Sequence, residues 1–164
     1  MTRATLATTS QNRRFAVTTV VLGVILLAHA AVTWPLFATA ALFGGGAVVA
    51  FVAEGFVIAL DWLEHHIGPK VLGVPLYVLF GWTGVVYLTF RIALLATDGW
   101  AAVVMAAGLA TTYDVLTDHY GVENGQWTYR DSLPGPRFRG VPWWNFAGWF
   151  LISCLTSALA LPFL

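Results

Sequence analysis

The sequence predicts an all-α, polytopic integral membrane protein, a helical bundle with about five transmembrane helices. Hydrophobic residues make up 59% of the 164 residues and charged residues only 10%, whereas soluble domains carry about 25% charged residues. The apolar residues also gather in runs close to the roughly 20 residues that a helix needs to cross a bilayer. A surface with so few charges must face lipid, where helices satisfy their own backbone hydrogen bonds.

Five runs qualify or nearly qualify as spans. In chain order they are Phe15–Trp34, Leu36–Leu60, Val71–Phe90, Trp100–Leu116 and Pro142–Leu164. Pro142 suits the first turn of the last helix, where its missing N–H costs nothing. We expect 1–14 to be a cytoplasmic tail and 15–164 a single transmembrane domain, with a long cytoplasmic, non-helical loop at 119–141. No internal repeat stands out.

The first run has a second interpretation. Arg13-Arg14 precedes it, and Ala28-His29-Ala30 resembles the small-residue cleavage site of a signal peptide. A removable signal peptide and an ordinary first membrane helix both explain these features, so both interpretations stay open.

The basic residues predict an integral cell-membrane protein with a cytoplasmic N-terminus. With five crossings, seven of the eight basic residues lie inside and only Arg91 lies outside, a strong positive-inside bias. The same topology brings acids and histidines from two separate segments to the cytoplasmic face. They are Asp61, Glu64, His65, His66, Asp118, His119 and Glu123, with Glu54 and Asp114 slightly deeper.

The deeper carboxylates are the candidate functional groups. On a continuous helix Glu54, Asp61 and His65 share one face, as Asp114 and Asp118 do. Acids inside membrane segments are costly and usually face a cavity or a partner. The alternatives are a solvated helix end for Asp118 and a satisfied packing bond for Glu54 and Asp114.

Several other chemistries are weighed on the same residues. Asp114 and Asp118 could hold magnesium for a diphosphate, with Lys70 and arginines nearby, but we expect no metal site. His65 and His66 are adjacent and point about 100° apart on a helix, which disfavours joint ligation. The single cysteine excludes a disulfide within one chain. The zero net charge gives no footprint for nucleic acid.

Three motifs in order resemble a known family. They are "IGPKVLGVPLYVLFGW" (67–82), "YDVLTDHYGVENGQWTY" (113–129) and "GVPWWNFAGWF" (140–150). Together they resemble the membrane-bound carotenoid biosynthesis family that includes bisanhydrobacterioruberin hydratase, also called carotenoid 1,2-hydratase. The resemblance covers roughly Val52 to Leu155, and Glu54 also fits it. The chain departs from the family at Asp61, Leu63, Glu64 and His119, so we expect a short divergent member.

The resemblance implies a hydro-lyase that adds water to a terminal isoprenoid double bond, without a redox cofactor. Burial favours the neutral form of a carboxyl group, so Asp114 and Glu54 are the candidate proton donors. Asp118 would stay ionised and activate water, as paired carboxylates divide roles elsewhere. Candidate substrate-binding residues are Trp127, Tyr129 and Trp149, whose rings would stabilise the cation, and Asn145, an inward-facing amide.

Two alternatives to hydration stay open. A carotenoid or isoprenoid cyclase would form the same cation and trap it with an internal double bond. A non-catalytic carotenoid-binding protein of a pigment pathway would use the same apolar surface. The expected partners are a lipophilic isoprenoid or carotenoid and membrane lipid, together with a second copy of the chain or a pathway membrane protein that completes the cavity.

Overall fold

A computed structural model describes residues 3–130 and 134–164, with side chains from residue 10 onward. Within these residues, five helical segments are long and apolar enough to cross a membrane. The first is α1 (Arg3–Thr33), of which 10–33 are apolar enough to span. The second combines α2 (Leu36–Ala40), the π-helical η1 (Ala41–Gly45) and α3 (Gly46–Ala59). The others are α4 (Leu76–Ala93), α5 (Gly99–Glu123) and α6 (Trp143–Ala160), which continues into the 3₁₀ turn η2 (Leu161–Phe163).

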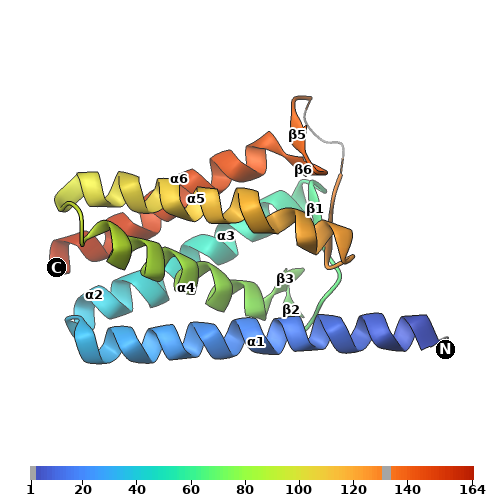
Figure 1. The fold of residues 1–164 in the computed structure, drawn as a ribbon, viewed down its shortest axis with the longest axis horizontal. Coiled ribbons are helices and arrows are strands. Elements are labelled where there is room, and N and C mark those ends of the chain that lie inside the picture. The colour runs from blue at the N-terminus through green and yellow to red at the C-terminus, as the bar shows by residue number, and fades with distance from the viewer. Residues whose placement is uncertain (1–2, 131–133) are drawn as a thin grey trace.

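The short strands all lie at the end of the bundle that holds the N-terminus, and the C-terminus lies at the other end (Figure 1). They form three two-stranded antiparallel pairs. In them β1 (Leu63–His65) pairs with β4 (Trp127–Tyr129), β2 (Lys70–Val71) with β3 (Val74–Pro75), and β5 (Arg137–Phe138) with β6 (Val141–Pro142). These strands connect α3 to α4 and α5 to α6.

The predicted membrane bundle is confirmed, while some helix boundaries differ from those expected. Helix α5 continues to Glu123, so the connection to α6 is shorter than the expected 119–141 loop, and it contains strands. In the additional helical turns Asp118 is partly buried and His119 is buried, and this burial favours helix over loop for these residues. Helix α4 begins at Leu76 rather than Val71 because Pro75, with φ −73° and ψ 134°, holds extended backbone before it.

The chain contains an internal repeat, which corrects the expectation that there is none. Residues 68–75 read GPKVLGVP and 135–142 read GPRFRGVP, and Gly-Trp follows at 81–82 and 148–149. Each copy of the motif belongs to the same series of elements, which consists of a helix, a strand, a two-stranded hairpin and a second helix. Their tight turns have matching positive φ angles, 50° and 85° at Leu72 and Gly73 against 50° and 89° at Arg139 and Gly140. We call 46–93 the first unit and 99–160 the second unit.

The two units meet as equivalent partners. In the β1–β4 ladder Glu64 lies opposite Thr128, Leu63 opposite Tyr129 and His65 opposite Trp127. This reciprocal pairing is what an approximate two-fold axis between the units produces. Up to this ladder the units match with an offset of 64 residues (Glu64 to Thr128), and after it with one of 67 (Gly68 to Gly135). Glu54 therefore corresponds to Asp118, His65 to Tyr129 and Trp82 to Trp149.

Helix α1 lies outside the repeat and packs along α4. Gly23 allows the two helices to approach each other closely, since a Cβ at this position would lie 2.7 Å from the Cβ of Phe80. Near the other end of α1, His29 is exposed on the helix surface, and its Nδ1 lies 2.7 Å from the hydroxyl of the buried Tyr87, a part-buried hydrogen bond within the expected membrane span.

The seven basic residues expected inside belong to segments at or near the N-terminal end of the bundle, and Arg91 lies in the last turn of α4 at the other end. Which end faces the cytoplasm stays a prediction. Reporter fusions at Asp98 and Gln126 should give opposite signals, with Gln126 inside.

Candidate active site

The β1–β4 ladder forms one wall of a cavity at the end of the bundle that holds the N-terminus. Successive side chains of a strand point to opposite faces, so the first and third residues of each strand face inward. These four, Leu63, His65, Trp127 and Tyr129, all line the cavity. The middle residues, Glu64 and Thr128, are exposed. The alternation therefore separates four inner side chains that line the cavity from two exposed polar ones.

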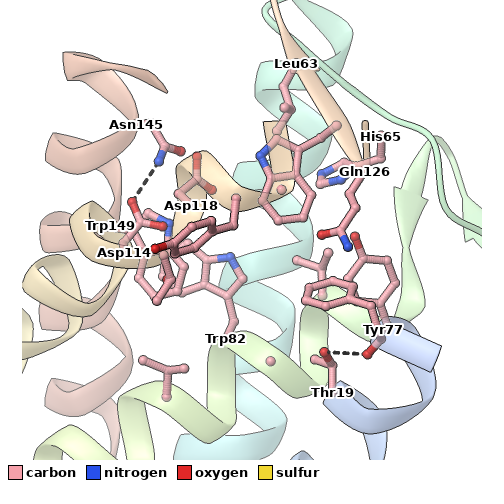
Figure 2. A pocket seen from close by; sticks show the side chains of 18 of the residues that line it. Thr19, Leu63, His65, Tyr77, Trp82, Asp114, Asp118, Gln126, Asn145 and Trp149 are labelled. Carbon is pink, nitrogen blue, oxygen red and sulfur yellow. Dashed lines mark hydrogen bonds between the residues drawn. The ribbon is translucent and has the colours of Figure 1, made fainter. Parts of the chain in front are cut away.

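The cavity has a volume of about 260 Å³ and receives side chains from α1, α3, α4, α5 and α6 as well as the ladder. All seven residues that the sequence suggested for a site line it, as Figure 2 shows for several of them. They are Glu54, Asp114, Asp118, Trp127, Tyr129, Asn145 and Trp149. Their roles in catalysis or binding stay predictions, but their convergence gives those predictions a single location.

Glu54 and His65 form a pair on the first unit. His65 Nε2 and Glu54 Oε2 lie 3.0 Å apart, with 5% and 12% of the two side chains exposed. The expectation that Glu54, Asp61 and His65 share one continuous helix is wrong, because α3 ends at Ala59. Asp61 adopts a positive φ of 61°, and the reversed chain returns His65 to Glu54 through β1.

Asp114 and Asn145 form a contact of the second unit that has no counterpart in the first. Asn145 Nδ2 donates a hydrogen bond of 2.8 Å to Asp114 Oδ2, and Asp114 is only 2% exposed. Asp118 lies one turn further along α5, and its buried Oδ2 has no hydrogen-bond partner among the described residues. Figure 2 shows these three side chains close together. Tyr129 and Trp127 are hydrogen-bond donors beside the Asp118 carboxylate, which lines the cavity within reach of a ligand.

Tyr129 faces the same carboxylates. Burial raises the pKa of its hydroxyl well above the usual range, and the negative charges of Asp118, Asp114 and Glu54 raise it further. The phenol therefore stays protonated and can donate a hydrogen bond to a carboxylate.

Aromatic rings form the rest of the cavity wall. Trp82 and Trp149, equivalent positions of the two units, stack with ring centroids 3.8 Å apart and planes 12° apart. Trp127 packs against α5 at Gly121, where an added Cβ would overlap the indole ring. Sequence reasoning did not select Trp82 or Tyr77, although the repeated Gly-Trp pair marks Trp82.

Three further acids, Asp61, Glu64 and Glu123, lie outside the cavity and form surface ion pairs. Arg130 contacts Asp61 at 2.9 Å and Glu64 at 2.7 Å, and Arg139 contacts Glu123 at 2.8 Å. Hydrogen bonding and charge from Arg130 hold the pKa of Glu64 below its usual range. The acids that seemed clustered in the sequence therefore divide into a buried set with Glu54, Asp114 and Asp118 and an exposed set that fastens the loops.

The chain also matches a known protein family. The carotenoid biosynthesis protein family matches residues 15–163, nearly the whole chain. The chain belongs to this family. No curated protein and no solved structure matches it significantly. Membership places this membrane protein in carotenoid biosynthesis, which implies lipophilic carotenoid substrates.

In the described part of the chain, no group of three or more histidine, cysteine, aspartate or glutamate side chains is placed to hold a metal ion. Asp114 and Asp118 therefore have no third protein ligand of these types beside them.

Proposed function

We propose that this protein is a hydratase, a hydro-lyase that adds water to the terminal double bond of an acyclic isoprenoid or carotenoid. The observation that carries the proposal is the convergence of three carboxyl groups, an amide and several aromatic rings in one cavity of an otherwise apolar membrane bundle. Ionisable groups in membrane segments are costly and usually functional.

The first step is protonation of the alkene by Asp114, with Glu54 as the second candidate donor. Asn145 fixes one oxygen of Asp114, which leaves the other oxygen to carry the proton toward the double bond. The proton adds to the less substituted carbon, and the two π electrons form the new C–H bond. A tertiary carbocation results at the neighbouring carbon.

The second step is capture of this cation by water. Asp118, with its unpartnered Oδ2, accepts a proton from the attacking water, whose oxygen forms the new C–O bond. The product is a tertiary alcohol, and the proton gained by Asp118 returns to the donor through water. Neither step changes the net oxidation level, so water is the only co-reactant.

The aromatic rings would lower the energy of the cation. Each ring face can contribute about 0.5–2 kcal/mol to a cation positioned over it. Trp127, Tyr129 and Trp149 line the cavity beside the acids, so a terminal isoprenoid group held there would meet at least one ring face.

Co-expression in a host that accumulates an acyclic carotene tests the proposal. Mass analysis should detect carotenes that have gained one water, and Asp114→Asn should abolish them. A cyclised product of unchanged mass would assign the chain to the cyclases. Unchanged carotene in the presence of folded wild-type protein would favour a non-catalytic carotenoid-binding role.

A further inference from the structure

The cavity is much smaller than a carotenoid. An engineered protein cavity of about 150 Å³ takes up benzene, with six carbon atoms. By that scale the 260 Å³ cavity holds roughly ten carbons, or about two isoprene units. If the proposed function is correct, the terminal units lie inside the cavity and the rest of the chain must leave it.

The exposed residues of the cavity lining are all on α5 or at its C-cap Asn124, which Gln11 of α1 contacts, so we place the opening between these two helices. Its lining there includes Thr19 from α1 and, from α5, Thr117, Tyr113 and Tyr120. The two tyrosines are 49% and 52% exposed. Helix α1 packs on α4 and makes little contact with α5, apart from a long hydrogen bond of 3.4 Å from Gln11 to Asn124. We call Thr19, Tyr113, Thr117 and Tyr120 the α1–α5 mouth.

The polar groups of the mouth favour a hydrocarbon over a lipid head group. Thr19 donates its hydroxyl hydrogen to Phe15 O at 2.9 Å, and Thr117 donates to Tyr113 O at 2.8 Å. With these hydroxyls bonded to their own helices, the threonines offer methyl groups to a ligand. No lysine or arginine lines the cavity in the described part of the chain, and His65 is buried and paired with Glu54, so a phosphate would find no counter-charge in the mouth.

We propose that the α1–α5 mouth is the binding subsite for the isoprenoid chain beyond its two terminal units. The chain runs from the acids past Thr19 and Thr117 into the bilayer, in contact with the rings of Tyr113 and Tyr120. The inference rests on the proposed function only for which end of the substrate enters. It commits the substrate to a linear, flexible or rod-like isoprenoid longer than about ten carbons.

Blocking the mouth with a large side chain tests this subsite. Thr117→Trp should reduce, by at least about five-fold, the amount of acyclic C40 carotene that co-purifies with the protein, measured by visible absorbance. Thr112→Trp is the matched control, because Thr112 is on the same helix, is exposed, makes the same backbone hydrogen bond at 2.8 Å and does not line the cavity. It should bind as much carotene as the wild type. Thr19→Phe and Thr18→Phe give a second matched pair on α1 if Thr117→Trp does not fold.

The same measurement separates the subsite from the chemistry. Asp114→Asn should keep the bound carotene while it loses hydration, and wild-type protein that binds carotene without hydrating it would sink the proposed function alone. Equal carotene in Thr117→Trp and wild type would overturn the subsite, as would equal losses in Thr117→Trp and Thr112→Trp. Displacement of carotene by added phospholipid, to the same extent in wild type and Thr117→Trp, would show that the mouth holds bulk lipid.

Discussion

The two units of the repeat place a carboxylate at the same position and surround it differently. Glu54 in the first unit faces an imidazole, His65, whereas the equivalent Asp118 in the second unit lies near a phenol, Tyr129. The second unit also carries a carboxyl group, Asp114, where the first has the buried Ala50. The two copies of one scaffold therefore carry different polar groups around equivalent carboxylates.

In the proposed function this difference has a chemical role. One group must deliver a proton and another must receive one, and both proposed groups, Asp114 and Asp118, belong to the second unit. Asn145 of the second unit stands where the first unit has Val78, also at the cavity wall. The second unit thus supplies the carboxyl pair and the amide that holds it, and the first unit supplies a glutamate coupled to a histidine.

The largest expected effect is at Asp114, the carboxyl group that has no counterpart in the first unit. Asp114→Asn keeps the shape and removes the transferable proton, so turnover should fall by about 10²–10⁴-fold, the usual contribution of general acid catalysis. Glu54→Gln should cost less if the donor belongs to the second unit. Product formation per folded protein in the carotene-accumulating host measures both.

Asp61→Asn is the control for both variants, since Asp61 is exposed and paired with Arg130. It should leave turnover unchanged. A larger loss in Glu54→Gln than in Asp114→Asn would move the donor to the first unit.

The second-largest effect tests the contact between His65 and Glu54. His65→Gln replaces the imidazole by an amide that can still hydrogen-bond Glu54 but cannot carry a proton, and we expect at least about a ten-fold loss of turnover, equal to about 1.4 kcal/mol in the barrier. The neighbouring His66, exposed and bonded to Thr128 at 2.8 Å, provides the matched control His66→Gln. Full turnover in His65→Gln, with an unchanged pH profile, would reduce His65 to a packing role.

The third effect concerns products rather than rate. Asn145→Leu, at similar volume, makes the second unit apolar like the first at this position and releases Asp114 from its hydrogen bond. The fraction of alcohol should fall, with more unreacted or cyclised carotene by chromatography. An unchanged alcohol fraction together with a lower melting temperature would mean that Asn145 only packs.

The smallest effect tests a feature that the units share. Trp82 and Trp149 occupy equivalent positions and stack on each other. Trp82→Leu and Trp149→Leu should therefore lower turnover to a similar degree, about 2- to 30-fold for a loss of roughly 0.5–2 kcal/mol of cation stabilisation. A strong loss in one variant alone would show that the cation forms over that ring and that the stack is functionally one-sided.

The sequence was sufficient for the features that depend on local composition. Apolar run lengths located the five spans, since a bilayer demands a fixed length of apolar helix, and Asp114 and Asp118 were correctly placed on one helical face. The ordered motifs indicated the family, which nearly the whole chain matches. The repeat was also in the sequence, but its shift from 64 to 67 residues and its few identical positions concealed it.

Contacts between distant segments were decided by the tertiary structure alone. His65 reaches Glu54 through a chain reversal at Asp61, rather than along a helix, and Asn145 reaches Asp114 across two helices. Residue spacing reports only which side chains share a face of one element, whereas these contacts depend on how the two units meet at the β1–β4 ladder. The same pairing turned Glu64 outward to Arg130, because alternate strand residues must face opposite sides. Asp61, in the turn before β1, pairs with the same arginine.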